Sequence, residues 1–140
     1  MERRRAADVL AAQDIEAVAV GFLHSFTNPV HERRAGEILA ERLPGVSVTL
    51  SSEVSPEMRE YERFSTACAN AYVQPLMARY LGNLRADLDA AGIACPLYLM
   101  LSGGGLTTVE TAMRFPVRLV ESGPAGGAIF AGHIARQCGL

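Results

Sequence analysis

The sequence predicts an α/β fold in which a small, mainly parallel sheet is flanked by helices. Short apolar runs alternate along the chain with segments of helical periodicity, as in strands joined by helical connections. Most of these runs are continuous rather than alternating, which is typical of strands covered on both faces. Only 6% of the residues are aromatic although 49% are hydrophobic, so aliphatic side chains are expected to fill the core.

The first 50 residues are predicted to alternate between helix and strand. We expect a helix over residues 3–13 and a strand over residues 17–23. Asn28-Pro29 predicts the next helix start, because Asn can cap a helix and Pro suits its first position. Pro44-Gly45 ends that helix, and a second strand follows over residues 46–50. The expected buried stripe of the helix is Ala35, Ile38, Leu39 and Leu43.

A long helical region is predicted after the polar segment 51–57. We expect one stripe of this region to face the core, because apolar residues recur in it every four positions. The stripe consists of Tyr72, Leu76, Tyr80, Leu84 and Leu88, beside Val73, Met77 and Leu81. Pro75 has no backbone N–H to donate, so we expect a kink there or two abutting helices. Ala90-Ala91-Gly92 ends the region.

The remaining residues are predicted to add two strands and two helices. The strands are expected over residues 96–101 and 117–120. A short helix should begin near Thr107, which has capping-box spacing to Glu110, and the last helix should begin at Ala125. Four short strands are few for such a fold, and no further strand follows the last predicted helix. We therefore expect the sequence to be part of a longer protein.

Charge and hydropathy exclude several classes of protein. The net charge is −2 and basic residues form no stripe interleaved with aromatics, so a nucleic-acid partner is excluded. No apolar run approaches the roughly 20 residues needed to cross a bilayer. Asp8, Asp14 and Glu16 interrupt any candidate signal segment. We therefore expect a soluble cytoplasmic protein without a membrane partner.

The cysteines and histidines form no recognisable metal or catalytic set. Cys68, Cys95 and Cys138 are far apart, and Cys68 and Cys95 stand in apolar stretches, so we expect small buried thiols. His24 stands at a predicted strand end and favours a structural role. No metal site and no catalytic residue is assigned.

Two glycine-rich segments, Ser102–Gly105 and Ser122–Gly127, each follow a predicted strand and precede a predicted helix. Ligands bind at such places in open α/β sheets, and glycine lets a phosphate approach the backbone closely. The P-loop and Gly-x-Gly-x-x-Gly patterns are both absent. Each segment is therefore open to two interpretations, a tight structural turn or part of a nucleotide site.

The stretch from Glu53 to Arg63 holds four carboxylates and two arginines, and it is likewise open to two interpretations. It can be a charged loop that enters a helix, because acidic side chains favour a helix N-terminus. Alternatively it lines the edge of a cleft, where Arg63 or Tyr61 would contact an anionic substrate.

Several stretches together resemble the hydantoinase A / 5-oxoprolinase family, which includes the acetone carboxylase type. They are residues 18–34, 51–63, 70–75 and 119–127. The segment Ser102-Gly-Gly-Gly-Leu106 is similar to the family's Ser-Asn-Gly-Gly-Leu but has Gly103 in place of Asn. The resemblance covers nearly the whole chain, in order.

The resemblance implies an incomplete part of an actin-like (ribonuclease H-like) ATPase fold of two lobes. Residues 1–69 would be the end of the N-terminal lobe, and residues 70–140 the start of the hydantoinase A main domain. The implied activity opens a cyclic amide such as a hydantoin or 5-oxoproline, with ATP and Mg²⁺ in the full-length protein. A partner subunit of the hydantoinase B type is also implied.

The glycine segments and the resemblance together predict the site residues. Those expected to line a nucleotide cleft are Gly104, Gly105, Ser122, Gly123, Gly126 and Gly127. Glu53, Tyr61 and Arg63 are expected near the substrate or between the lobes. Both Asp-x-Gly-Gly-Thr loops of the family are absent, so the chain alone should bind ATP weakly and be inactive. The rival hypotheses are a non-catalytic module that binds a partner and a subunit of a ketone carboxylase-type complex.

Overall fold

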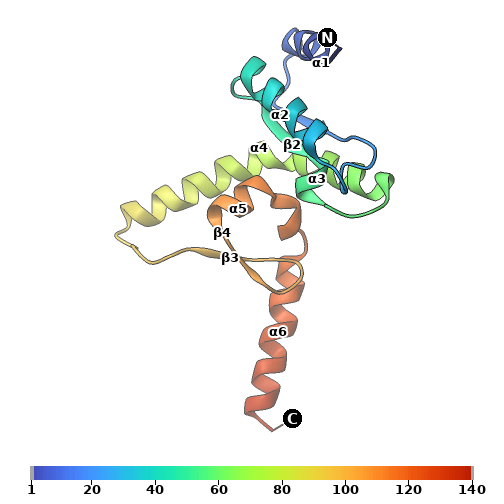
Figure 1. The fold of residues 1–140 in the computed structure, drawn as a ribbon. Helices are drawn as coiled ribbons and strands as arrows, with labels where there is room; N and C mark the ends of the chain where they lie inside the picture. Colours follow the sequence, from blue (N-terminus) through green and yellow to red (C-terminus); the bar gives the residue numbers. More distant parts are fainter. Residues whose placement is uncertain (1, 140) are drawn as a thin grey trace. The chain divides into compact units, whose positions relative to one another are not determined.

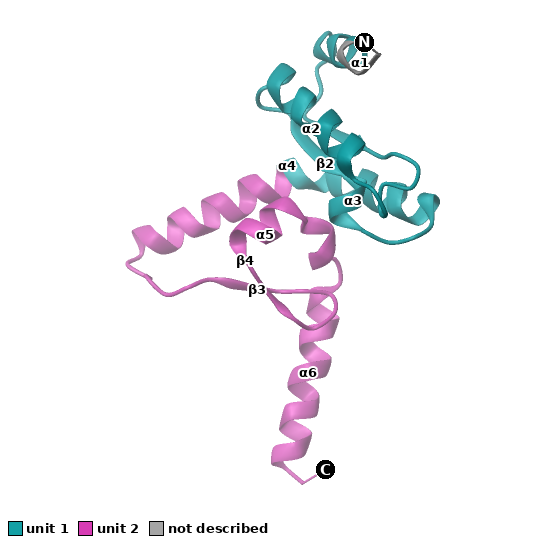
Figure 2. Cartoon of the chain, in the orientation of Figure 1, with its two compact units in different colours: residues 1–75 teal, residues 76–140 magenta. Residues whose placement is uncertain are grey.

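A computed structural model describes residues 2–139, with side chains from residue 5 onward. The chain forms two compact units (Figure 2). Unit 1 extends to Pro75, and unit 2 starts at Leu76. Within the described range, no helix combines the length and apolarity needed to cross a membrane.

Unit 1 is built around a strand–helix–strand arrangement (Figure 1). Its elements are α1 (Glu2–Ala11), β1 (Ala17–Val20), α2 (Val30–Arg42), β2 (Ser47–Leu50), α3 (Ser51–Val54) and the first part of α4 (Glu60–Ala90). β1 and β2 are parallel, with Ala17 opposite Ser47 and Val20 opposite Leu50. The predicted order of helices and strands in the first 50 residues is therefore confirmed, but β1 ends at Val20 and not at residue 23, and α2 begins one residue after Pro29.

The core of unit 1 lies between α1, α2 and the parallel pair. Its buried residues are Ala7, Val20, Ala35, Leu39, Leu43 and Leu50. α2 packs so closely on β2 that a Cβ on Gly36 would lie 2.9 Å from Leu50 Cδ2. Pro29 occupies the cap position of α2, and the Asn28 side chain accepts a hydrogen bond from the Val30 amide at 3.3 Å. The predicted buried stripe of α2 is confirmed, with Ile38 half-buried.

Unit 2 contains the rest of α4 and a β-hairpin with three further helical elements. They are β3 (Tyr98–Met100), β4 (Leu106–Thr108), α5 (Val109–Arg114), the 3-10 helix η1 (Pro116–Leu119) and α6 (Ser122–Gln137). β3 and β4 are antiparallel, with Met100 opposite Leu106. The buried core is small and consists of Leu81, Val109 and Ala112.

Unit 2 departs from the predicted parallel sheet in several places. Residues 117–120 form no strand, because Pro116 begins a 3-10 turn that includes most of them. α5 is capped by Thr108 rather than Thr107, through a 3.3 Å bond from the Thr111 amide to Thr108 Oγ1. The last helix begins at Ser122 and not at Ala125. The α/β class is correct, but only the unit 1 pair is parallel.

α4 differs from its prediction in continuity and in register. It continues as one helix through Pro75, so the predicted alternative of two abutting helices is wrong. Tyr72, Leu76 and Tyr80 are 87%, 63% and 57% exposed, whereas Leu81 is fully buried. A four-residue repeat drifts by about 40° per step around a helix of 3.6 residues per turn, so it cannot keep to one face. The expectation that these three residues face the core is wrong. It is confirmed for Leu81, which is buried, and for Met77 and Leu84, which pack against the core of unit 2.

The cysteines also contradict their prediction. Cys68, Cys95 and Cys138 are all exposed, free thiols. Cys68 follows the buried Ala67 on α4 and therefore points to a different side of that helix. Cys95 lies between α4 and β3, outside both elements.

Candidate functional site

The two glycine-rich segments lie side by side in unit 2. The Ser102 amide donates to the carbonyl of Arg118 at 2.9 Å. Ser102 Oγ lies 2.7 Å from the same carbonyl oxygen and is also within hydrogen-bonding distance of the Val120 carbonyl, so its one proton can be donated to either. The turn between β3 and β4 is therefore tied to the backbone that leads into α6.

The first segment, Ser102–Gly105, joins two strands and not a strand to a helix. Gly104 has a φ of +83°, which side chains rarely adopt. A Cβ on Gly104 would also lie 2.8 Å from Ile129 Cδ1 of α6. The nearest atom to a Cβ on Gly105 is Leu101 Cδ1, at 3.8 Å. Gly104 thus has a structural reason to be glycine, and Gly105 has a much weaker one.

The second segment lies within the first two turns of α6. Ser122 and Gly123 are its first residues, and the amides at the start of a helix have no carbonyl one turn earlier to bind. No side chain caps this helix, and Glu121 before it is left-handed with φ 63° and ψ 20°. The amides of Gly126 and Gly127 fall within the helical hydrogen-bond ladder instead. Only the earlier positions can offer amides to a ligand.

The helical glycines are only partly explained by packing inside the chain. A Cβ on Gly126 would lie 3.9 Å from Met100, which is an ordinary contact. A Cβ on Gly123 or Gly127 would meet nothing within 4 Å. Glycine inside a helix costs about 0.5–1 kcal/mol relative to alanine. Gly123 and Gly127 therefore leave backbone open to something outside the chain.

The groups of this site that could hold a ligand are backbone amides rather than acidic or imidazole side chains. A helix N-terminus combines free N–H groups with a positive dipole end, and this suits a phosphate. Among the side chains of residues 5–139, no three His, Cys, Asp or Glu gather so that they could hold a metal ion. The site is thus suited to an anionic group such as a phosphate.

Arg63 lies in unit 1, where its side chain is fully buried. Its Nε donates to Ser51 Oγ at 3.2 Å, and Nη1 donates to the Glu57 carbonyl at 3.0 Å. Nη2 donates to the Phe22 carbonyl at 3.0 Å and to Glu60 Oε1 at 3.3 Å. Arg63 therefore joins the segments that follow β1 and β2 to the start of α4.

Glu60 connects Arg63 to the loop after β1, and we name Arg63 with Ser51 and Glu60 the Arg63 cluster. Its Oε1 also accepts a hydrogen bond from the His24 amide at 3.1 Å. This bond and the one from Arg63 hold the pKa of the Glu60 carboxyl below its usual value. His24 itself has a φ of 55°, so the bond fixes a left-handed residue. His24 contributes its backbone here, in line with the structural role that the sequence favours.

Glu32 belongs to the same region and was not predicted. It is fully buried on α2, where its carboxylate accepts from the amides of Ser51 at 2.7 Å and Ser52 at 3.3 Å. It thereby occupies the N-terminus of α3. The signal for it is its position: Glu32 precedes Ala35 and Leu39 by three and seven residues and so lies on the buried stripe of α2.

The other two predicted residues of the charged stretch lie apart from these contacts. Glu53 is half-buried on α3, directly after β2. Tyr61 is 81% exposed on α4. The structure thus brings Arg63 to the carboxyl ends of the parallel strands, where α/β proteins bind ligands, and leaves Tyr61 facing solvent.

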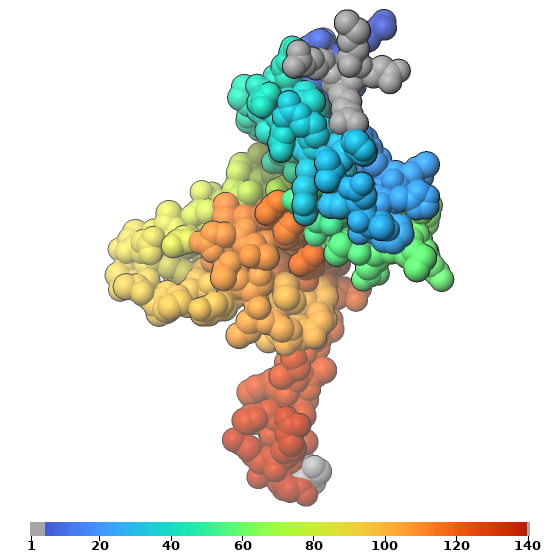
Figure 3. Space-filling model, viewed as in Figure 1, coloured from blue at the N-terminus to red at the C-terminus, as the bar shows by residue number. Residues whose placement is uncertain are grey.

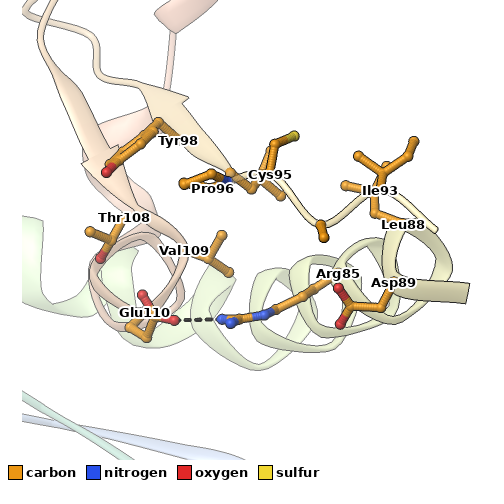
Figure 4. A pocket seen from close by; sticks show the side chains of 12 residues that line it. Arg85, Leu88, Asp89, Ile93, Cys95, Pro96, Tyr98, Thr108, Val109 and Glu110 are labelled. Atoms are coloured by element: carbon orange, nitrogen blue, oxygen red, sulfur yellow. Dashed lines mark hydrogen bonds and ion pairs between the residues drawn. The ribbon is translucent and has the colours of Figure 1, made fainter. Parts of the chain in front are cut away.

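A separate pocket of about 380 Å³ lies in unit 2, next to the end of α4 (Figure 4). Arg85 and Glu110 form an ion pair of 2.6 Å along one wall. The pKa of the Glu110 carboxyl is lowered by a hydrogen bond from its own backbone amide, and then by Arg85 and Thr108. None of the residues predicted for a nucleotide cleft lines this pocket.

Two sequence models of known families match the chain. The model described as hydantoinase/oxoprolinase matches residues 63–140. The model described as the hydantoinase/oxoprolinase N-terminal region matches residues 1–43. Together they match all of unit 2 and most of unit 1, with residues 44–62 between the two matches.

Individual relatives match nearly the whole chain. Caprolactamase subunit alpha from Pseudomonas jessenii is 38% identical over 96% of this chain and 19% of its own length. An uncharacterised protein of Methanocaldococcus jannaschii is 39% identical over 96% of this chain and 20% of its own. The 5-oxoprolinase of Saccharomyces cerevisiae is 40% identical over 86% of this chain and 9% of its own. The chain thus spans about a fifth of these relatives' length, or less.

Two solved structures share the fold. The ATP-dependent caprolactamase from Pseudomonas jessenii has a TM-score of 0.89 and 35% identity, over 99% of this chain and 20% of that one. Acetone carboxylase in a nucleotide-free state has a TM-score of 0.84 and 27% identity, over 98% of this chain and 20% of that one.

Proposed function

Because the chain belongs to the hydantoinase/oxoprolinase family, we propose that it forms part of an ATP-dependent enzyme that opens a cyclic amide of the hydantoin or 5-oxoproline type. The observation that carries this proposal is the pair of adjacent glycine segments beside an uncapped helix start. The residues proposed to line the nucleotide cleft are Gly104, Gly105, Ser122, Gly123, Gly126 and Gly127.

In the proposed enzyme, ATP supplies a phosphoryl group that activates the carbonyl of the substrate. The amides of Ser122 and Gly123 bind phosphate oxygens, and the dipole of α6 favours the negative charge. Gly127 leaves the helix surface bare, so that the nucleotide or an adjoining segment can approach closely. The Ser102 bonds to the backbone before α6 hold the two segments in register.

Unit 1 is proposed to contribute on the substrate side. Arg63, with Glu32, fixes the segment from Ser51 to Glu57, and Glu53 on that segment then lies near the substrate or the joint between lobes. Tyr61 is free to contact a substrate or another lobe, because its ring is exposed. Arg63 acts through the residues it holds, since its own donors bind within unit 1.

The whole protein is proposed to have an actin-like ATPase fold with Mg²⁺ bound beside the nucleotide. Residues 1–69 would complete its N-terminal lobe, and residues 70–140 would begin its main domain. A partner subunit of the hydantoinase B type is proposed as well, because one relative carries the name subunit alpha.

Calorimetric titration with ATP and Mg²⁺ tests the nucleotide site. The protein is a chimera in which residues 1–140 replace the matching stretch of caprolactamase subunit alpha. Gly123→Asp should weaken ATP binding about tenfold or more, a loss of about 1.4 kcal/mol, through repulsion of the phosphates. The fold should persist, because an acidic residue suits a helix start.

His133→Asp is the matched control, since it places an acidic side chain on α6 away from its N-terminus, at the one polar position between Gly123 and Ala135. It should leave ATP affinity unchanged. An unsubstituted chimera that folds but binds no ATP would sink the nucleotide proposal.

Ketone carboxylation is a second candidate, favoured by the TM-score of 0.84 to acetone carboxylase. ATP hydrolysis by a polypeptide of the relatives' length separates the two. Stimulation by hydantoin or 5-oxoproline supports ring opening, whereas stimulation by acetone with bicarbonate supports carboxylation.

A further inference from the structure

α6 is a 16-residue helix without a single buried residue. Phe130, Ile129 and Ile134 are 66%, 48% and 39% exposed. Figure 3 shows the atoms of α6, in red, uncovered by other elements of unit 2 along most of the helix. Large apolar side chains grouped in this way on one element differ from single exposed apolar residues, which are common on any surface.

The composition of α6 is that of an interior helix. From Gly123 to Ala135, His133 has the only polar side chain. Surface helices carry a polar face opposite the apolar one, and a helix that is apolar all round belongs in a protein core. α6 therefore needs cover on more than one side.

Unit 2 covers one side of α6 only. Ile129 meets Gly104, and Gly126 meets Met100 of β3. A second side is formed by Gly127, Phe130, Ala131 and Ile134, spaced three, four and seven residues from the first of them. We name these four residues the outer face of α6. Its small residues, Gly127 and Ala131, would let another backbone approach closely.

The surface area of the chain also indicates missing cover. Its accessible surface is 9345 Å². Two separate globular units of about 8 and 7 kDa would together expose roughly 8,500 Å². The excess of roughly 850 Å² is close to the ~800 Å² that each partner buries in a standard interface.

We propose that the outer face of α6 is covered by further polypeptide of the same protein, outside residues 1–140, and not by a second copy of this chain. Two solved structures contain this fold over 98% and 99% of its length as 20% of a longer chain, so about four-fifths of each of those chains is available to cover it. A symmetric contact between two copies would cover one patch, whereas α6 is apolar all round. The inference does not depend on ATP binding.

The chain of 140 residues tests this proposal first, by light scattering after size exclusion and by binding of the apolar dye ANS. The unsubstituted chain should associate into species of mixed size and bind ANS. Phe130→Glu with Ile134→Glu should give a monomer that has lost most ANS binding. Its melting temperature should change by less than about 2 °C, because Phe130 is 66% exposed, Ile134 is 39% exposed and neither belongs to the buried core of unit 2. His133→Glu, on the same helix, should behave like the unsubstituted chain.

The chimera with caprolactamase subunit alpha provides the second test. There Phe130→Glu with Ile134→Glu should abolish most of the folded yield, because the two charges would be buried, and His133→Glu should not. Three results would overturn the proposal: a discrete dimer of the chain that the double substitution dissociates, a monomer that binds no ANS, or a doubly substituted chimera as stable as the original. A stable chimera that loses only a partner subunit would assign the outer face to that partner instead.

Discussion

The two units differ in how fully their side chains are buried and paired within the unit itself. Unit 1 buries the ionisable side chains of Glu32 and Arg63, and both find their hydrogen-bond partners within the unit. Unit 2 pairs Arg85 with Glu110 on its surface and leaves α6 without a buried residue. Unit 1 is thus closed by its own polar contacts, whereas unit 2 exposes an apolar helix that needs further cover.

Removal of the Arg63 side chain should give the largest change in the stability of unit 1. Arg63→Ala leaves a cavity and deprives Ser51 and two carbonyls of their donor, so unit 1 should lose about 3–5 kcal/mol of stability. Urea denaturation followed by circular dichroism measures the loss. Arg33→Ala, at an exposed position on the same unit, should change stability by less than about 0.5 kcal/mol. A loss of similar size for both would show that the Arg63 cluster does not hold unit 1 together.

Glu32 tests the other half of the same network. Glu32→Ala leaves the amides of Ser51 and Ser52 without a partner, and the expected loss is about 2–3 kcal/mol. The urea midpoint compared with that of Glu37→Ala, an exposed position on α2, gives the result. Equal midpoints for the two variants would contradict a structural role for the buried carboxylate.

Gly104 tests how firmly the hairpin of unit 2 is packed on α6. Gly104→Ala must adopt a positive φ and place its Cβ against Ile129, at an expected loss of about 1–3 kcal/mol. Adding Ile129→Ala should recover the part due to the clash but not the part due to φ. Thermal unfolding of both variants separates the two contributions, and no recovery would mean that the contact with Ile129 is not tight.

A substitution at Gly127 should increase stability, in contrast to the three substitutions above. Gly127→Ala should stabilise the isolated chain by about 0.5–1 kcal/mol, because the added Cβ meets nothing in it. Gly36→Ala in unit 1 should instead destabilise, since its Cβ would lie 2.9 Å from Leu50. Melting temperatures of the two variants decide, and a destabilised Gly127→Ala chain would show that the outer face is already occupied.

The smallest expected effect is a difference in acid sensitivity. The folded-state pKa of Glu60 is lowered, chiefly by the His24 amide and then by Arg63. Its contribution is therefore fully present above the unfolded pKa of about 4.3 and is lost as pH falls through the lower folded value. Glu60→Gln should flatten the decline of the urea midpoint of unit 1 below pH 5. An unchanged decline would show that the Glu60 carboxylate does not contribute to the stability of unit 1.

Much of unit 1 could be predicted because its signals are local. The apolar run Ala17–Val20, the start of α2 at Asn28-Pro29 and the stripe through Leu39 each depend on neighbouring residues. The parallel pairing of β1 and β2 could be predicted because a helix connects them, and parallel strands need such a crossover. Glu32 was missed because a carboxylate suggests a solvent-facing position, and only α3 explains its burial.

Unit 2 was harder to predict because non-local contacts decide its structure. Residues 117–120 have strand-like composition, but Pro116 and the Ser102 bonds to this backbone hold them in a turn. The glycine segments were recognised as candidates, yet nothing in the sequence shows that they are adjacent. Tyr72 and Tyr80 belong to the predicted core stripe, but at 3.6 residues per turn they lie about 180° and about 100° around the helix from the buried Leu81.

Hydrogen exchange of the 140-residue chain with Phe130→Glu and Ile134→Glu, which should be monomeric, is read by mass spectrometry and tests the contrast between the units most directly. We expect slow exchange in β1 and β2 and fast exchange throughout α6, with amides of α6 protected about a hundredfold less, or weaker still, than those of β2. Equal protection of α6 and β2 in a monomeric sample would contradict it, because α6 would then be stable without further cover.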